Sequence, residues 1–273
     1  MLQDRAESAT AKIADYWNRN LHDRGIARSP AGAREYFAEM DAYRFQKLRY
    51  LPRIVDFDGY SGQSLLEVGC GVGIDLIRFA RGGAEVTGID ASEVAIDLAF
   101  QNFSQQGLPC RLGVMSGEEL AFPGDCFDVV YSHSTLQYTA DPEAMVREIH
   151  RVLRPGGEAI LMVYNRFSWL NALSKVCRVD LEHHDAPAFH KHAIGEFRSL
   201  LRCFVKVRII PERFPVPTRL HGGLKARLYN ELFVKIFGVL PKRLTRPFGW
   251  HLMAFATKAV DSAEIGWSRV ARS

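Results

Sequence analysis

The stretch LLEVGCGVGIDLIRFARGGAEVTGID, residues 65–90, decides the fold. One acid precedes three glycines at alternate positions and a second acid ends the stretch: Glu67, Gly69, Gly71, Gly73 and Asp90. The apolar run before the glycines predicts a strand, and the residues after them predict a helix that ends at Gly82. A strand that passes through glycines into a helix presents free backbone N–H groups to a ligand packed against the backbone.

Strand and helix patterns alternate from this stretch to about residue 164. We therefore expect an α/β fold, a three-layer sandwich with a seven-stranded, mainly parallel sheet whose last strand is antiparallel. Residues 1–58 are expected to form an N-terminal helical lid segment and residues 59–273 the main domain. Insertions at about 165–194 and 214–248 precede the last strands, and we expect them to form a substrate cap, because ligands of open α/β sheets bind beyond the carboxyl ends of the strands.

The glycine stretch allows three interpretations. A plain strand–helix turn needs fewer glycines than this. A dinucleotide site would follow the pattern G-x-G-x-x-G/A, but Ile74 or Leu76 stands at the third small position. The third interpretation is a ligand with a cationic end, which Glu67 would attract, and a ribose, whose hydroxyls Asp90 would bind. S-adenosylmethionine has both features.

Residues 65–92 resemble motif I and the following acidic strand end of class I (Rossmann-like) S-adenosylmethionine-dependent methyltransferases, in the small-molecule-type branch. The segment EELAFPGDCFDVVYSHSTLQYTADPEAMVREIHRVLRPGGEAILMVY, residues 118–164, is similar to the later motifs of the same family. The resemblance implies methyl transfer from S-adenosylmethionine. It also implies a cofactor site made of Tyr36, Arg44, Glu67, Gly69, Cys70, Gly71, Gly73, Asp90, Ala91, Ser116, Gly117, Glu118, Ser132 and His133.

Within this resemblance, Asp90 would hold the ribose, and Ser116 stands where the family usually has an aspartate for the adenine. Arg44 is expected to grip the carboxylate of the methionine part. His133 and Tyr164 are the expected catalytic residues, the first as a general base and the second to orient the acceptor. Both residues could equally be structural.

The segment HHDAPAFHKH, residues 183–192, contains four histidines. A metal site, a substrate pocket and a solvated loop are all compatible with it, and His183, His184 and His192 are the candidates for contact. We expect no metal here, because imidazole sites usually draw their ligands from separate elements with fixed supporting contacts.

Charge divides the chain unevenly. The net charge is +4, but residues 202–246 carry eleven Lys and Arg against two acids, about +9, which leaves about −5 elsewhere. A solvated face, an anionic or membrane-bound acceptor, and RNA would each explain the excess. Residues 224–240 favour peripheral membrane contact, because Leu224, Leu228, Leu232, Ile236 and Leu240 form one apolar row on the expected helix.

The five cysteines form no CxxC pair, and the beginning of the chain lacks the pattern of a signal peptide, so we expect a cytoplasmic protein. We expect an enzyme that methylates oxygen, nitrogen or carbon of a small hydrophobic or amphiphilic metabolite. The alternatives are an RNA-modifying methyltransferase and a non-catalytic S-adenosylmethionine-binding protein.

Overall fold

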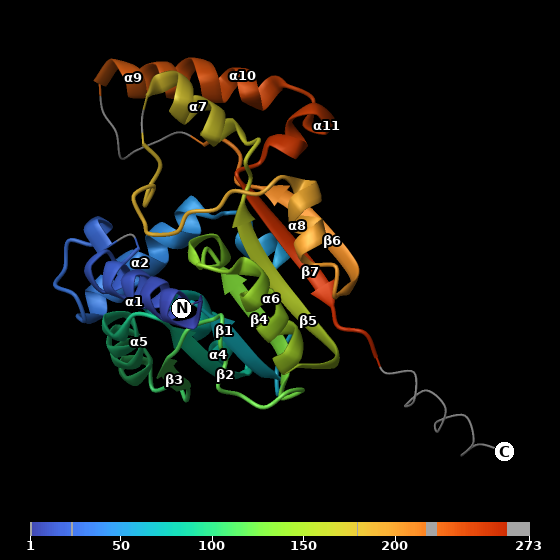
Figure 1. Cartoon of the computed structure of the whole chain (residues 1–273). Coiled ribbons are helices and arrows are strands. Elements are labelled where there is room, and N and C mark those ends of the chain that lie inside the picture. The colour runs from blue at the N-terminus through green and yellow to red at the C-terminus, as the bar shows by residue number, and fades with distance from the viewer. Residues whose placement is uncertain (1, 23, 179, 217–222, 261–273) are drawn as a thin grey trace.

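A computed structural model describes residues 2–22, 24–178, 180–216 and 223–260 (Figure 1). The strands are β1 (Ser64–Val68), β2 (Glu85–Asp90), β3 (Arg111–Val114), β4 (Phe127–His133), β5 (Leu153–Tyr164), β6 (Val205–Glu212) and β7 (His251–Thr257). The α-helices are α1 (Leu2–Arg19), α2 (Arg34–Lys47), α3 (Leu51–Ile54), α4 (Ile74–Arg81), α5 (Glu93–Gln106), α6 (Pro142–Val152), α7 (Trp169–Cys177), α8 (Ile194–Leu200), α9 (Gly223–Leu228), α10 (Val234–Val239) and α11 (Lys242–Thr245). Short 3-10 turns are η1 (Arg24–Ile26), η2 (Leu136–Tyr138) and η4 (Arg246–Phe248), and η3 (Tyr229–Phe233) is a π-helix.

The strands form one seven-stranded sheet in the order β3-β2-β1-β4-β5-β7-β6. Strands β1 to β5 pair in parallel, whereas β7 is antiparallel to both β5 and β6. The expected sheet, with its antiparallel last strand, is confirmed. The chain order reverses between β1 and β4, and ligands of open α/β sheets bind at the carboxyl ends of the strands at such a point.

Alternate residues of each strand enter opposite cores, as the pleat of a strand requires. Leu65 packs in the core that contains α4, and its neighbour Leu66 packs in the core that contains α6 and α8. Helices therefore cover both faces of the sheet (Figure 1). The central strands read as continuous apolar runs because they are buried on both sides.

The N-terminal helices pack over the glycine stretch. Residues of α2 share a small core with the beginning of α4 and with α5, and this core contains Tyr36, Phe37, Met40, Ile74 and Leu98. Helix α1 is tied to the beginning of α5 through Asn18, whose Oδ1 accepts a hydrogen bond from the Ser92 hydroxyl at 2.8 Å. The segment that precedes β1 therefore lies against the carboxyl ends of β1 and β2.

Two elements differ from the sequence pattern. Strand β5 begins at Leu153 and continues through residues 154–157, whose proline and two glycines are more typical of a turn. The predicted helix over residues 224–240 is divided into α9, the π-helix η3 and α10. These helices lie with α7 in an outer layer beyond the sheet (Figure 1).

Candidate active site

A cavity of about 1240 Å³, counting the open space at its mouth, lies at the carboxyl ends of β1, β2 and β4. Most of the expected cofactor residues line it: Arg44, Glu67, Gly69, Cys70, Gly71, Asp90, Ala91, Ser116, Gly117, Glu118 and His133. The structure thus brings together residues from five separate segments of the chain.

The glycine loop needs both its backbone conformation and its lack of side chains. Gly69 and Gly71 have φ of +77° and +53°, in the left-handed region that favours glycine. A Cβ on Gly69 would lie 1.9 Å from Oγ1 of Thr135, so the loop after β4 packs directly on the backbone here. A Cβ on Gly71 would meet no atom within 4 Å. Because Gly71 lines the cavity, its open side leaves room for a ligand against the backbone.

Asp90 fixes the far side of the glycine loop. Its Oδ2 accepts a hydrogen bond from the Gly71 backbone N–H at 2.9 Å, and its Oδ1 accepts one from the Ser92 N–H at 2.9 Å. Burial raises the pKa of the Asp90 carboxyl, although these backbone bonds oppose the shift. Each carboxylate oxygen can accept a second hydrogen bond, so a ligand hydroxyl in the cavity still has an acceptor.

Asp75, which the sequence analysis did not single out, organises the other end of the cavity. The Arg44 guanidinium donates to both carboxylate oxygens of Asp75, with 2.5 Å between Arg44 Nε and Asp75 Oδ1. The Tyr131 hydroxyl also donates to Asp75, at 2.7 Å. The pKa of Asp75 is lowered, since these contacts outweigh the effect of burial. Two of the three Arg44 nitrogens are therefore held inside the protein, which differs from the expected role of Arg44 as a ligand clamp.

The Glu67 carboxylate of the site has an unmet need for a hydrogen-bond donor. Its Oε2 is buried and has no hydrogen-bond partner among the described residues. Burial, and then the nearby Asp75 carboxylate, raise the pKa of Glu67 well above its usual range. A cationic group beside Oε2 would counter both effects and restore the ionised carboxylate.

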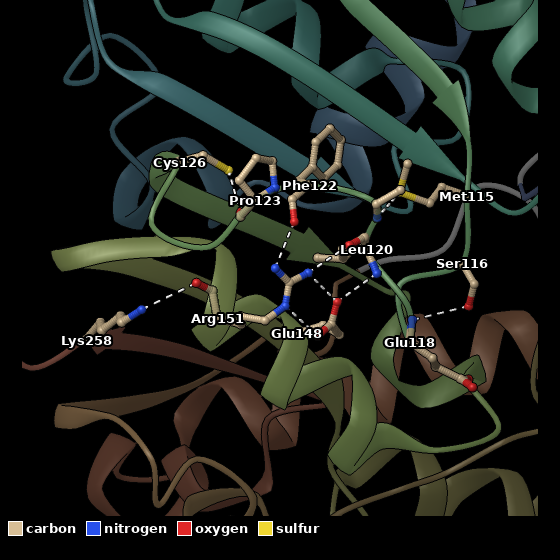
Figure 2. A network of polar contacts seen from close by, with 11 residues as sticks. Met115, Ser116, Glu118, Leu120, Phe122, Pro123, Cys126, Glu148, Arg151 and Lys258 are labelled. Carbon is tan, nitrogen blue, oxygen red and sulfur yellow. Dashed lines mark hydrogen bonds and ion pairs between the residues drawn. The ribbon is translucent and has the colours of Figure 1, made fainter.

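The loop after β3 forms a third wall, and α6 braces it (Figure 2). The guanidinium of Arg151 donates to the backbone carbonyls of Leu120 and Phe122 at 2.7 and 2.8 Å. Glu148 pairs with Arg151 at 2.6 Å and accepts the Leu120 N–H at 2.8 Å. At the cavity end of this loop, the Ser116 hydroxyl accepts the Glu118 N–H at 3.2 Å. Helix α6 thereby fixes the loop that carries the expected adenine-binding residues.

His133 belongs to a row of buried polar groups whose hydrogen bonds all run in the same donor-to-acceptor direction. Arg213 can only donate, so Nε2 of His251, 3.0 Å away, accepts. Burial, the first of several causes, lowers the pKa of both His133 and His251 well below the usual range, so both rings are neutral. His251 Nδ1–H therefore donates to the Tyr50 hydroxyl at 2.6 Å, and Tyr50 donates to His133 Nε2 at 3.0 Å.

The row ends at the cavity wall. Because His133 Nε2 accepts, its proton is on Nδ1, which donates to the Ser134 hydroxyl at 3.1 Å. Both nitrogens of the expected base are thus engaged. Ser134, which the sequence analysis did not select, lines the cavity beside His133.

Four expected residues do not line the cavity: Tyr36, Gly73, Ser132 and Tyr164. Tyr36 is buried in the core between α2 and α5, and a Cβ on Gly73 would lie 3.1 Å from the ring of Phe103. The Ser132 hydroxyl donates to the Val68 carbonyl at 2.9 Å. The ring of Tyr164 stacks on Trp250 at 4.4 Å, and its hydroxyl lies 3.5 Å from that of Tyr138. These residues support the walls rather than the ligand.

Helix α1 and the residues that follow it supply a wall of the cavity whose individual residues were not among the expected ones, although residues 1–58 were expected to form a lid. The further lining residues are Thr10, Ile13, Trp17, Leu21, His22, Met40, Val68, Val72, Ile74, Asp75, Ser92, Ala95, Met115, Ser134, Thr135, Tyr138 and Thr139. Helix α1 is amphipathic, which signals packing but not the partner. In the described part of the chain, no residue from 178 onward lines the cavity. The proposed cap over residues 165–194 and 214–248 therefore stays a prediction, as does the division at residue 58.

These groups fit S-adenosylmethionine. The buried, unpartnered Glu67 Oε2 suits an ammonium group, the open side of Gly71 suits a ligand in contact with the backbone, and Asp90 retains acceptor capacity for ribose hydroxyls. The apolar side chains of Ile13, Leu21 and Met115 suit the less polar parts of such a ligand.

Known proteins agree with this fit. Residues 66–161 match the family model described as a methyltransferase domain. The ubiquinone biosynthesis O-methyltransferase of Pseudomonas paraeruginosa is 36% identical over 110 residues, which cover 40% of this chain and 47% of that protein. Its counterpart in Cereibacter sphaeroides is 31% identical over 165 residues, covering 60% of this chain and 65% of the relative. The matches thus span about half to two thirds of the relatives.

Solved structures match over a larger part of the chain. The magnesium protoporphyrin IX methyltransferase of Synechocystis, solved with S-adenosylhomocysteine, has a TM-score of 0.61 at 16% identity, covering 91% of this chain and 99% of that one. The geranyl diphosphate C-methyltransferase of Streptomyces coelicolor has a TM-score of 0.59 at 17% identity, covering 92% and 98%. At such identities the likeness establishes the fold. Residues 66–161 thus match a methyltransferase domain, and the chain shares its fold with S-adenosylmethionine-dependent methyltransferases.

Proposed function

We propose that this protein transfers a methyl group from S-adenosylmethionine to a small hydrophobic or amphiphilic metabolite by in-line displacement. The observation that carries the proposal is the cavity at the carboxyl ends of β1, β2 and β4, with an unpartnered Glu67 oxygen at its wall. When bound, S-adenosylmethionine supplies an activated methyl group. The residues of this chain need only hold the two reactants in line and exclude water.

In this proposal Glu67 holds the ammonium group and Asp90 the ribose hydroxyls. Ser116, Gly117 and Glu118 lie along the adenine, on the loop that Arg151 fixes. Arg44 acts mainly by holding Asp75 and by adding positive charge near the carboxylate of the methionine part of the cofactor.

His133 is a positioning residue in this proposal rather than a free base. Its Nδ1–H holds the Ser134 hydroxyl, and its Nε2 accepts from Tyr50. Proton acceptance by His133 would require one of these bonds to break. Tyr164 acts through Tyr138, whose side chain lines the cavity. A pH–rate profile tests this assignment, because a general base at His133 would give an acidic limb that His133→Gln abolishes.

The acceptor side is apolar and aromatic. Trp17 and Tyr138 line the cavity, with ring centroids 4.9 Å apart. The relatives from Pseudomonas and Cereibacter are named for O-methylation in ubiquinone biosynthesis, which favours oxygen of an amphiphilic acceptor. Nitrogen and carbon remain alternatives that product analysis distinguishes.

Calorimetry with S-adenosylmethionine and S-adenosylhomocysteine tests the cofactor site. Asp90→Ala should weaken binding by about 1.5–3 kcal/mol, the scale of hydrogen bonds to a charged group, which is roughly 10- to 150-fold in Kd. Asp97→Ala, an exposed acid on α5, is the matched control and should bind as the unaltered protein does. Equal affinity in both variants would contradict the assignment of Asp90 to the ribose.

Turnover separates methyl transfer from the two alternatives. The protein is incubated with methyl-labelled cofactor and a small-molecule extract or an RNA extract of its own cell. Label in a small metabolite is the expected result. Label in RNA, together with RNA binding that weakens as salt rises, would favour the RNA-modifying alternative. Cofactor binding with label in neither extract would favour a non-catalytic protein.

We also propose that the outer layer meets an anionic membrane surface. The row Leu224, Leu228, Leu232, Ile236 and Leu240 is between 44% and 74% exposed, and the basic residues Arg227, Lys235, Arg243 and Arg246 are exposed around it. On an adjacent face of the same helices, Tyr229, Phe233 and Phe237 pack on Trp169 of α7. The aromatic side thus meets the protein, and the apolar row remains available to lipid.

Vesicle sedimentation tests this contact. Vesicles with about a third anionic lipid should bind the protein and neutral vesicles should bind it weakly, because about 1 kcal/mol is gained per basic residue near an anionic surface. Replacing Leu228, Leu232 and Ile236 together by serine should abolish binding. Val176→Ser, at a more exposed apolar position on α7 (81%), should not. Equal binding by the triple variant would contradict the proposal.

Among the described helices, none combines the length and apolar character that a membrane crossing requires. We propose a cytoplasmic location, at the inner leaflet, supported by the five cysteines, all of which are free thiols.

A further inference from the structure

A second cluster of ligand-type side chains lies beside the cavity, which one of its members, His22, also lines. His22 follows α1, whereas Glu182 and His183 lie in the loop after α7, some 160 residues later in the chain. One potential ligand atom from each lies within 4.8 Å of the others. Nδ1 of His22 and Nε2 of His183 are each 3.9 Å from Glu182 Oε1, so one carboxylate oxygen faces two imidazole nitrogens.

The hydrogen bonds behind His183 set its tautomer. The Tyr16 hydroxyl donates its single proton to Asp185 Oδ1 at 2.8 Å. Its oxygen lies 3.1 Å from His183 Nδ1, and must accept there, so Nδ1 carries the proton. His183 Nε2 then presents a lone pair towards Glu182. A ligating histidine whose other nitrogen donates to a supporting oxygen is the usual arrangement in metal sites.

The Glu182 carboxylate is oriented as well. Its Oε2 lies 3.3 Å from Lys47 Nζ, on the last turn of α2, which turns Oε1 towards the two imidazoles. The rings hold their positions by packing: His183 lies 4.8 Å from the Trp17 ring and 5.1 Å from the His22 ring. The side chain of His183 is only 12% exposed. Three potential ligands are thus fixed by contacts that involve α1, α2 and the loop after α7.

We propose that His22, Glu182 and His183 bind a divalent transition-metal cation of the Zn²⁺ type. Two imidazole nitrogens and one carboxylate oxygen are ligands that such a cation accepts, and they leave a fourth position open. Ligand atoms of a tetrahedral zinc site lie about 3.3 Å apart, so the two 3.9 Å sides of the triangle must close by roughly half an ångström and the third, which is within 4.8 Å, by at most about 1.5 Å. This inference departs from the expectation that the histidine-rich segment holds no metal. It stands apart from the proposed methyl transfer.

The position of the site gives it a role. His22 also lines the cavity, so a cation here would lie at the cavity wall with its open position available to water or to an oxygen of a molecule in the cavity. It would also join the end of α1 to the loop after α7. The nearby charge of Lys47 opposes a cation, so moderate affinity is expected rather than that of a closed structural zinc site.

Cobalt titration of the full chain, prepared without a histidine tag, tests the site, because Co²⁺ in a site of low coordination number absorbs visible light. One equivalent of Co²⁺ should bind, and Zn²⁺ should displace it. His183→Ala and His22→Ala should each weaken binding by at least about 10-fold. His184→Ala is the matched control: this neighbour is 51% exposed, lies outside the triangle, and should leave the titration unchanged.

Circular dichroism and thermal unfolding of each variant establish that it is folded, and Glu182→Gln gives a variant of nearly unchanged shape. No absorption change up to about millimolar Co²⁺ would overturn the inference. So would equal binding by folded His183→Ala, or an equal loss in His184→Ala, since the cation would then be bound elsewhere.

Discussion

The cofactor edge of the sheet and the outer layer of α7, α9 and α10 are built in opposite ways. At the cofactor edge, polar groups are buried and held by named partners, as in the Arg44–Asp75–Tyr131 contacts and the row from Arg213 to Ser134. In the outer layer, leucines and isoleucine are left exposed while aromatic rings pack beneath them. The first construction encloses a ligand in a fixed polar environment. The second presents an apolar surface whose partner lies outside the chain.

The largest loss of stability is expected where the buried contacts of the cofactor edge are broken. Asp75→Ala leaves the largely buried Arg44 guanidinium without its partner, and such losses cost about 3–5 kcal/mol. Urea unfolding measures the change. Asp97→Ala should stay within about 0.5 kcal/mol of the unaltered protein. A small loss in Asp75→Ala would mean that the site tolerates an unpaired charge and is less enclosed than the structure indicates.

A smaller change in stability is expected when the pH is lowered. The buried His251 has a folded pKa well below its unfolded value, so only the unfolded state takes up a proton below about pH 6.5. Stability should therefore fall as the pH falls below that value, by about 1.4 kcal/mol per pH unit for each such histidine. Urea unfolding at pH 5.5 and 7.5 measures it.

His251→Gln should reduce the loss of stability between pH 7.5 and pH 5.5 by the part that comes from protonation of His251 in the unfolded state. The raised pKa values of Glu67 and Asp90 act in the opposite direction, since the folded state keeps their protons longer, but they cancel in the difference between the two proteins. The same pH dependence in the variant would mean that His251 is charged in the folded state, and the direction assigned to the row would be wrong.

The smallest changes in stability are expected in the outer layer, where they should differ between two neighbouring residues. Phe233→Ala removes ring contacts with Trp169, Tyr229 and Phe237 and should cost about 1–2 kcal/mol, as for a half-buried aromatic side chain. Leu232→Ala, at a 56% exposed position, should change stability by less than about 0.5 kcal/mol. Unfolding of both variants and hydrogen exchange of α9 and α10 measure this. Equal losses would indicate that the row is covered within the protein.

The sequence predicts the cofactor edge well where function depends on the backbone. Alternate glycines and the two acids at 67 and 90 lie within 24 residues, so local spacing is enough to place them together. Successive side chains of a strand face opposite sides of the sheet, and this rule alone distinguishes His133, which lines the cavity, from Ser132, which faces the opposite side of β4.

Contacts between distant segments were beyond the sequence pattern. The apolar face of α1 predicts burial but does not identify the cavity as its partner, and Asp75 is one acid among many until α2 brings Arg44 to it. His22 lies alone in the sequence, 160 residues from Glu182. Such pairings depend on the direction in which α1 and α2 cross the sheet, which no spacing within either helix specifies.

The pairing of β6 with β7 has a consequence for how the protein could be altered. Glu212, the last residue of β6, is the cross-strand partner of His251, the first of β7, so residues 213–250 leave and return at adjacent positions. Closing such a loop costs an entropy that grows slowly with its length, and neighbouring strands can be joined by a short turn. The outer helices α9–α11 are therefore an exchangeable module on the sheet edge, and related chains could gain, lose or replace it while keeping Arg213 and the same cofactor edge.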